Sequence, residues 1–383
     1  MNEPLVSIVV PVYNGGADLK KCLQSIAASS WRSIECVVVD DASDDGMTGI
    51  AADSIGARVI WLKNQRGPSR ARNRGVEEAT GDIIFFVDAD VVVHEDTIEK
   101  AVRVLQNSPE TAAVFGSYDT SPENASFISQ YRNLYHHWIH QTARTDASTF
   151  WTGCGAIRRS VFIDAGGFNE SFDRPSIEDI EFGGRLLASG HKIRLEKEMQ
   201  CQHLKQWTLG NVIYTDVFQR GIPWMKLLLT SHELPNDLNI SYKSRIATLL
   251  AGLLALAVVL LPLTGHADTL IPSVFFLAAS ASCVAMAFKP RTPSFLPLLL
   301  VILPASFALI YDLQPLSVLP LAMILIIAWT QLGFYVLVAK RHNLAFAFAV
   351  VPMQVIFFAG CAFSAAMGIM IHFFGKFREL FAR

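Results

Sequence analysis

Two aspartates separated by one residue directly follow a short apolar run. Asp88-Ala89-Asp90 comes after Ile83-Ile84-Phe85-Phe86-Val87. In an extended strand alternate side chains share a face, so Asp88 and Asp90 lie on one side and Ala89 on the other. Two converging carboxylates repel each other unless a cation lies between them, and such oxygen ligands suit Mg²⁺ or Mn²⁺. The spacing predicts a divalent-metal site; the alternative is an ordinary surface turn.

The elements that must position this pair are strands alternating with helices. Helical spacing links Leu19 to Ile26, and Pro68 opens a second helix that runs to about Ala79. A third helix carries Glu95 and Asp96 in its first turn. The sequence predicts four strands, at residues 6–10, 36–39, 58–62 and 83–87.

Uninterrupted apolar strands that alternate with helices predict an α/β domain with a mostly parallel, Rossmann-like sheet covered on both faces. Ligands bind such sheets at the carboxyl ends of the strands. The polar residues found there are the turn from Pro11 to Asn14, Asp40-Asp41, and Asp88-Ala89-Asp90. We therefore expect the functional site at this edge.

Composition divides the chain into two parts. It has 383 residues, 51% hydrophobic and 17% charged, with a formal net charge of −2 that gives no electrostatic support to nucleic-acid binding. Between Ile246 and Ala339 the only charged residues are Asp268, Lys289, Arg291 and Asp312. A segment of that size with so little charge predicts a multi-pass membrane domain after a water-soluble one.

The cysteines and the N-terminus bear on cellular location. The six cysteines have no Cys-x-x-Cys spacing, which favours reduced thiols in a reducing compartment. The first residues lack a basic region followed by a cleavage site, so we expect no cleaved signal. The prediction is a multi-pass membrane protein, of the bacterial inner-membrane type, with its soluble part in the cytoplasm.

Residues 5–205 resemble family 2 glycosyltransferases of the GT-A fold. Several motifs occur in the order found in that family, whereas each alone is weak. The matching segments are Ser7 to Asn14, Val39 to Gly46, Arg70 to Gly75, Asp88 to Asp90, Gly153 to Arg159, Gly166 to Phe168, and Ile177 to Glu181.

The resemblance implies a nucleotide-sugar pocket. The turn containing Pro11, Tyr13 and Asn14 would shape the base and ribose site, and Asp41 would accept hydrogen bonds from the base. Asp88 would lie near the ribose and the metal. One or two of the arginines at 66, 70, 72 and 74, with Arg72 our choice, would reach the diphosphate, or they form a solvated helix face. Arg185 is a weaker candidate for the phosphates.

The resemblance also implies the metal ligands. Asp88 and Asp90 would hold the ion, with Asp90 the more direct ligand. His203 stands where related enzymes often place a histidine near the metal, and a nitrogen ligand would favour Mn²⁺ over Mg²⁺. The alternative for His203 is a purely structural role.

For catalysis, the resemblance implies an inverting displacement. Asp179 would be the general base that removes the proton of an acceptor hydroxyl, a contribution of typically about 10²–10⁴-fold. Glu178 would orient the base or the acceptor. Alternatively, Asp179 only stabilises the first turn of the helix that follows it.

Three histidines, His136, His137 and His140, lie in a segment with apolar residues at helical spacing. This pattern favours an amphipathic helix packed on the domain or on a membrane surface over a histidine metal site. The apolar residues are Phe127, Tyr131, Leu134 and Trp138.

We expect four parts: a GT-A domain at 1–205, an interfacial amphipathic linker at 206–244, a membrane domain at 245–375 and a basic tail at 376–383. The alternative for the linker is a plain packing helix. Candidate spans are Ile246 to Thr264, Leu270 to Phe288, Phe295 to Tyr311, Leu316 to Ala339 and Leu344 to Phe374.

Loop charges place Lys289, Arg291, Lys340 and Arg341 on the cytoplasmic side. A fifth span would put the basic tail outside, against that trend. Either the fifth stretch is re-entrant or the tail faces out, so the expected number of spans is four or five.

The sequence thus predicts a metal-dependent glycosyltransferase that moves a sugar from a nucleotide sugar, most often a UDP-sugar in this family, to an acceptor in cell-surface glycan or polysaccharide synthesis. The acceptor would be lipid-linked, such as a polyprenyl phosphate, or membrane-proximal, reached beside membrane lipids. A processive synthase is the first alternative, although its Gln-x-x-Arg-Trp motif is broken here between Gln219 and Trp224. A nucleotide-binding transporter or scaffold is the second.

Overall fold

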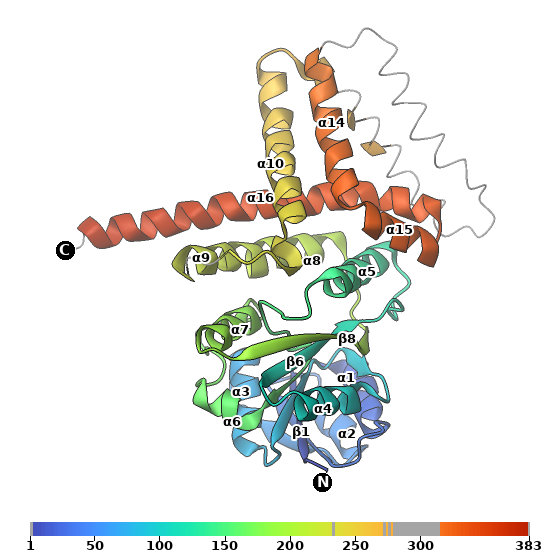
Figure 1. Cartoon of the computed structure of the whole chain (residues 1–383), viewed down its shortest axis with the longest axis vertical. Helices are drawn as coiled ribbons and strands as arrows, with labels where there is room; N and C mark the ends of the chain where they lie inside the picture. The colour runs from blue at the N-terminus through green and yellow to red at the C-terminus, as the bar shows by residue number, and fades with distance from the viewer. Residues whose placement is uncertain (1–2, 232–233, 271–272, 275–276, 279–314, 382–383) are drawn as a thin grey trace. The chain divides into compact units, whose positions relative to one another are not determined.

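The computed structural model describes residues 3–231, 234–270, 273–274, 277–278 and 315–381 (Figure 1). Its contacts divide the chain into two compact units, Met1–Thr208 and Leu209–Arg383. Each unit is described separately below. Unit 1 contains the sheet, and the part of unit 2 that the structure describes is helical.

Unit 1 is built on one twisted sheet whose first four strands are parallel. They are β1 (Val6–Val12), β2 (Ile34–Asp40), β3 (Arg58–Trp61) and β4 (Ile83–Val87), and they lie in the order β3-β2-β1-β4. Every residue of β4 is buried, as expected for a strand covered on both faces. The α/β fold with a mostly parallel sheet is confirmed.

Helices cover both faces of this sheet. One face packs against α1 (Gly16–Ala27), α2 (Thr48–Asp53) and α4 (Thr97–Asn107). The other face packs against α3 (Pro68–Glu78), α6 (Arg159–Asp164) and α7 (Glu178–Ala188). The alternation is visible in β4, where Phe85 faces the first group and Phe86 contacts Phe162 of α6 at a ring distance of 5.5 Å.

The second half of the sheet has mixed directions. Strand β7 (Cys154–Arg158) runs antiparallel to both β4 and β6 (Thr111–Tyr118), and the long β8 (Lys192–His203) runs parallel to β6. A three-residue strand, β5 (Val91–Val93), pairs antiparallel with β8 and so brings Val91 opposite His203. This pairing places the residues after β4 beside the end of β8.

Two helices differ in detail from their predictions. Helix α4 begins at Thr97, so Glu95 and Asp96 precede its first turn rather than forming it. Helix α5 (Phe127–Thr142) exists as predicted, but it is not amphipathic, because buried residues occur around most of its circumference. The imidazoles of His137 and His140 are buried against the Tyr118 and Gly116 carbonyls.

Unit 2 begins with a continuous helical run over residues 209–231. It consists of α8 (Leu209–Tyr214), a π-helical segment (Thr215–Gly221) and α9 (Ile222–Ser231). Pro223 lacks the amide that an α-helix would direct to the residue four positions earlier, and the wider π turns precede it. We call this run the 209–231 helix.

The remaining described helices of unit 2 are long and apolar. They are α10 (Tyr242–Leu263), α14 (Pro315–Thr330), α15 (Leu332–Arg341) and α16 (Leu344–Phe381). By length and composition, Tyr242–Leu263 and Leu344–Phe374 are candidate membrane spans among the described residues. Leu319–Thr330 of α14 and α15 form a pair bent by 66°, which counts as a third candidate if the pair is one span.

The predicted span from Leu316 to Ala339 corresponds to this bent pair, which is either one broken span or a re-entrant loop. The Thr330 hydroxyl donates to the Ile327 carbonyl, a local bond that bends helices, and Gln331 is the N-cap of the next helix, α15. The predicted spans Leu270 to Phe288 and Phe295 to Tyr311 lie mostly or wholly outside the described residues.

Candidate functional site

The turns after β1 and β2 are joined by hydrogen bonds. The Asn14 amide donates to the Ser43 hydroxyl at 2.8 Å, and the Asp44 amide donates to the Asn14 side-chain oxygen at 2.9 Å. Asn14 and Ala42 both have positive φ, at 52° and 65°, so the backbone turns sharply away from the sheet at both positions. Tyr13 stands exposed between these contacts. The result is a firm polar rim at the carboxyl ends of two strands.

Two aspartates end β2, and the structure gives them different roles. Asp40 is fully buried, and one of its oxygens accepts the Ser43 amide. Asp41 accepts the amides of Arg66 and Gly67 at 2.9 and 2.7 Å, which fixes the loop before α3. Burial raises the pKa of Asp41, although these two amides oppose the rise. Asp41 therefore shapes this edge of the sheet by holding a loop.

The buried Arg72 connects the predicted metal motif to the predicted catalytic helix. Its guanidinium donates to Asp88 at 2.8 Å and to Glu178 at 3.0 Å, and its side chain is only 5% exposed. Glu178 also accepts the Ser176 amide through its second oxygen, so both oxygens of this buried carboxylate have partners. The Arg72 guanidinium therefore links Asp88 to the start of α7.

Asp90 faces His203 across the end of the sheet. Its carboxylate lies 3.6 Å from the imidazole Nε2, and the pairing of β5 with β8 produces this approach. The His203 ring is buried and stacks on Tyr118 with a centroid distance of 4.3 Å. Burial alone would raise the pKa of Asp90, but His203 and nearby Lys205 lower it overall.

Asp179 lies in the first turn of α7 with two other acids, Glu178 and Glu181. One Asp179 oxygen accepts the Ile180 amide at 2.8 Å, as a carboxylate at a helix N-terminus does. The side chain is only partly buried. Thus Asp179 has the contacts of a helix-stabilising acid and the exposure that a general base needs.

Arg185 lies in the last turn of the same helix, and its donors are used within the domain. It pairs with Glu181 at 2.8 Å and donates to the carbonyls of Ala165 and Gly167. These contacts hold the Gly166-Gly167 turn, where both glycines have positive φ. They favour a structural role for Arg185 over the predicted phosphate contact.

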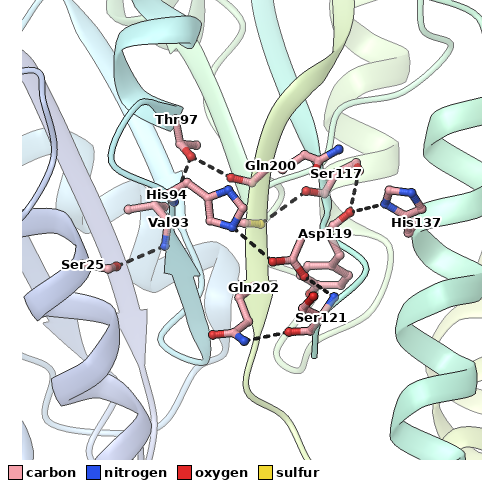
Figure 2. Close-up of polar contacts among 12 residues, drawn as sticks. Ser25, Val93, His94, Thr97, Ser117, Asp119, Ser121, His137, Gln200 and Gln202 are labelled. Atoms are coloured by element: carbon pink, nitrogen blue, oxygen red, sulfur yellow. Dashed lines mark hydrogen bonds and ion pairs between the residues drawn. The ribbon is translucent and has the colours of Figure 1, made fainter. Parts of the chain in front are cut away.

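A second polar network holds β5, β6 and β8 together beside the site (Figure 2). His94 contacts Asp119 at 3.1 Å, and Asp119 also accepts the Ser121 amide. The Gln202 side chain donates to the Ser121 carbonyl at 2.7 Å. These bonds fix the strand ends that carry Asp90 and His203.

The donor set at this edge fits a divalent cation in part. One carboxylate and one imidazole nitrogen face each other in the Asp90–His203 pair, and both donor types bind Mn²⁺. Asp88 is the third predicted ligand, but Arg72 occupies one of its oxygens. Within the described ranges, no three His, Cys, Asp or Glu side chains form a ready metal cluster. Remaining ligands would have to come from a bound diphosphate, as hard cations commonly require.

Several residues that shape this site have no strong sequence signal. Tyr118 supports the His203 ring and lies outside every matching segment, and Ser43 joins the first two turns, although the sequence assigned no role to it within Val39 to Gly46. The His94–Asp119 contact joins residues 25 positions apart. Asp119 is the exception. It directly follows the buried strand β6, so a search for polar residues at strand ends would have found it.

A mostly parallel sheet with carboxylates gathered at its strand ends defines an α/β domain of the nucleotide-binding type. Residues 7–166 match the family model described as glycosyl transferase family 2. The chain therefore carries a family 2 glycosyltransferase domain of the GT-A fold.

Curated relatives agree with this family. An uncharacterized glycosyltransferase of Haemophilus influenzae is 37% identical over 112 residues, which are 28% of this chain and 45% of the relative. Glycosyltransferase GlyG of Streptococcus pneumoniae is 33% identical over 130 residues, 32% of this chain and 43% of the relative. The chain thus spans less than half the length of either relative.

Solved structures show a more distant likeness. The mannosyltransferase PcManGT of Pyrobaculum calidifontis, in complex with GDP-Man and Mn²⁺, is 20% identical, with a TM-score of 0.43 over 87% of this chain and 88% of that one. TarS 1-349 of S. aureus, in complex with UDP-GlcNAc, is 17% identical, with a TM-score of 0.48 over 95% of this chain and 92% of that one.

Proposed function

We propose that this protein is a membrane-anchored, inverting glycosyltransferase that transfers a sugar from a nucleotide sugar to a lipid-linked or membrane-proximal acceptor. The observation that carries the proposal is the double contact of Arg72. It joins Asp88, at the end of the donor-side strand, to Glu178, beside the candidate base Asp179. A transferase needs a donor site and a base within reach of one reacting carbon, and this arrangement supports that geometry.

The donor binds at the rim formed by the first two strand-end turns. The exposed Tyr13 and the turn from Pro11 to Asn14 contact the base and ribose. Asp41 supports this rim by holding the loop before α3, and the base would accept or donate hydrogen bonds beside it. A UDP-sugar is the donor we propose, since this nucleotide is the most frequent in the family. Arg72 holds Asp88 near the diphosphate.

Asp88, Asp90 and His203 would hold the cation, for which Mn²⁺ suits the mixed oxygen and nitrogen donors. When bound, it supplies electrostatic stabilisation of the charge that develops on the departing nucleoside diphosphate. The His203 ring keeps its orientation through Tyr118, as the supporting residues of metal ligands commonly do.

Asp179 removes the proton of the acceptor hydroxyl while that oxygen attacks the anomeric carbon. The bond between this carbon and the diphosphate oxygen breaks in the same displacement, so the anomeric configuration inverts. Glu178 is a positioning residue in this proposal, because both its oxygens bind within the protein. It holds the first turn of α7 and therefore the direction of Asp179.

The apolar helices of unit 2 support an acceptor delivered from the bilayer. A polyprenyl phosphate or a lipid-linked saccharide combines a soluble head with a membrane anchor, and the cytoplasmic face is where nucleotide sugars are available. Membrane anchoring, the cytoplasmic side and the acceptor class are parts of the proposal.

The test is a donor screen by nucleotide release in purified membranes. We expect release from one nucleotide sugar, dependent on Mn²⁺ and abolished by EDTA, with Asp90→Asn lowering the rate at least 100-fold. The matched control is Asp53→Asn, which removes an exposed carboxylate at the end of α2. Full activity in EDTA, or an Asp90→Asn rate equal to that of the control, would refute the metal-dependent proposal.

A further inference from the structure

Helix α16 is long and apolar enough to cross a membrane, yet it packs against the 209–231 helix, which is not a candidate span, as well as against the candidate span α10. The first 31 residues of α16 have a mean hydropathy of 2.1 in their best window. Within unit 2, α16 runs alongside the 209–231 helix, while α10 and α14 run across it (Figure 1). The direction of α16 in a membrane therefore depends on its neighbours.

Small residues on α16 form close contacts with the 209–231 helix. A Cβ added to Gly360 would lie 3.2 Å from Val217, and one added to Gly368 would lie 2.6 Å from Met225. Between them, the Ser364 hydroxyl contacts the Val217 carbonyl at 3.4 Å. Both helices advance by eight residues between the first and last contacts, so they run parallel and in the same direction over about two turns.

The 209–231 helix cannot itself cross a membrane at low cost. It contains Asp216, Arg220 and Lys226, and both basic side chains are exposed. Charged residues at the centre of a spanning helix cost about 2.5–3.5 kcal/mol each on insertion scales. Exposed Tyr214 and Phe218 accompany these charges, a composition typical of a helix that lies in the interface.

Helix α10 contacts α16 over only part of its length. Its buried residues run from Ser244 to Leu254, and a Cβ on Gly252 would lie 3.0 Å from Ala362. Beyond this segment, Val258, Val259 and Leu263 are all more than half exposed. Two parallel spans would remain in contact along their whole length, whereas this pattern indicates crossing helices.

We propose that α16 lies in the plane of the membrane, within the leaflet that α10 enters first, and does not span it. Its partner is the lipid of that leaflet. The apolar cluster that α10 shares with α16 begins at Ala247, five residues into α10 and about 8 Å along its axis, so α16 lies deeper than the start of α10. This depth accounts for its apolar composition, and exposed Phe363, Phe373 and Phe374 contact the lipid.

This orientation also resolves the conflict in the loop charges. The basic residues Lys376 and Arg378 lie in the last turns of α16, and Lys340 precedes the helix. With α16 in the plane, both basic segments lie on the same side, as the positive-inside rule requires. A spanning α16 would separate them.

The test is labelling of single introduced cysteines in the full chain, expressed in bacterial cells, with a membrane-impermeant maleimide before and after permeabilisation. Lys340→Cys and Arg383→Cys mark the two ends around α16, and Leu263→Cys marks the far end of α10. We expect the 340 and 383 positions to label under the same condition and the 263 position under the other. Labelling of 383 together with 263 would overturn the proposal.

Cross-linking tests the helix pairing directly in the membrane. In a Cys361→Ala background, Val217→Cys with Gly360→Cys should form a disulfide on oxidation. Val217→Cys with Ile371→Cys, displaced by three turns along α16, should not. Equal cross-linking of the two pairs, or none in the first, would remove the contact on which the in-plane orientation rests.

Discussion

At the residue scale, Arg72 is the most consequential side chain of the site. A guanidinium this deeply buried is tolerated only because two carboxylates share it, and the charges of Asp88, Glu178 and Asp179 raise its pKa despite burial. Its motif was evident in the sequence, but its function was not. Glu178 lies 106 residues away, and no periodicity relates two positions that distant.

Replacing Arg72 should destabilise unit 1 strongly. Arg72→Met leaves Glu178 buried without its cation, which costs about 3–5 kcal/mol for pairs of this kind. Arg74→Met is the matched control, since the Arg74 side chain is 43% exposed and pairs with acids at the surface, and its cost should stay below about 1 kcal/mol. Denaturant unfolding of the detergent-solubilised chain, followed by near-ultraviolet circular dichroism, measures the difference. Similar midpoints for both variants would contradict the bridging role.

Asp179→Asn separates two classes of acceptor. With a hydroxyl acceptor, loss of the base should lower kcat by about 10²–10⁴-fold while the donor still binds. With a phosphate acceptor, already anionic, much of the rate should survive. Transfer of radiolabelled sugar to each acceptor type measures this, with Glu77→Gln as a control for an exposed acid on α3. Unchanged rates with both acceptors would exclude Asp179 as the base.

At the element scale, the parallel half of the sheet was predictable and the mixed half was not. Strands β1 to β4 are continuous apolar runs that end in turn residues, so their polar ends were found directly. Strand β5 has only three residues, too few to show the alternating apolar and polar pattern of a strand. Helix α5 looked amphipathic because histidines count as polar, although His137 and His140 are buried against strand carbonyls. Such tertiary hydrogen bonds leave no mark on hydropathy.

The pairing of β6 with β8 leaves no room for a side chain at Gly116. An added Cβ would lie 1.9 Å from the Met199 carbonyl oxygen, so Gly116→Ala should destabilise unit 1 by at least about 1–3 kcal/mol. Gly184 in α7 has open space around the same position, and Gly184→Ala should instead be neutral or stabilise by up to about 1 kcal/mol. Thermal unfolding of both variants tests this contrast. A Gly184→Ala protein less stable than the unaltered protein would contradict it.

The His94–Asp119 contact should make the edge of the sheet sensitive to pH. The hydrogen bond to Asp119 raises the pKa of His94, with Asp96 adding to the rise and burial and Lys100 opposing it. The contribution to stability is therefore fully present below the unfolded imidazole pKa, about 6.5, and is lost as pH rises through the higher folded value. His94→Gln should lower the melting temperature at pH 6 and have little effect at pH 9. If the loss of melting temperature caused by His94→Gln were larger at pH 9 than at pH 6, this predicted pH dependence would be contradicted.

At the scale of the whole molecule, the chain separates the candidate site from the candidate membrane spans. The sheet and every candidate site residue belong to unit 1, and the candidate spans belong to unit 2. Composition predicted this separation, because charge nearly disappears after Arg245. It did not predict the direction of α16, since hydropathy measures how apolar a helix is and not which neighbour it packs against.

A chain ending after Thr208 should fold and leave the membrane. Unit 1 has its own core, with both faces of its sheet covered by its own helices. We expect this fragment in the supernatant after sedimentation of membranes, with the circular dichroism of a folded α/β domain, and the full chain in the pellet. An insoluble or unfolded fragment would show that unit 1 depends on the rest of the chain.

The stacking of His203 on Tyr118 has a practical outcome. Trp207 lies 6.3 Å from the same imidazole, and Trp151 packs edge-on against Tyr118 at 4.9 Å. Indole emission responds to the polarity and charge of its surroundings over such short ranges. If the proposed cation binds at Asp90 and His203, these indoles would report its presence, and titration with a paramagnetic ion such as Mn²⁺ should quench their emission without any attached dye.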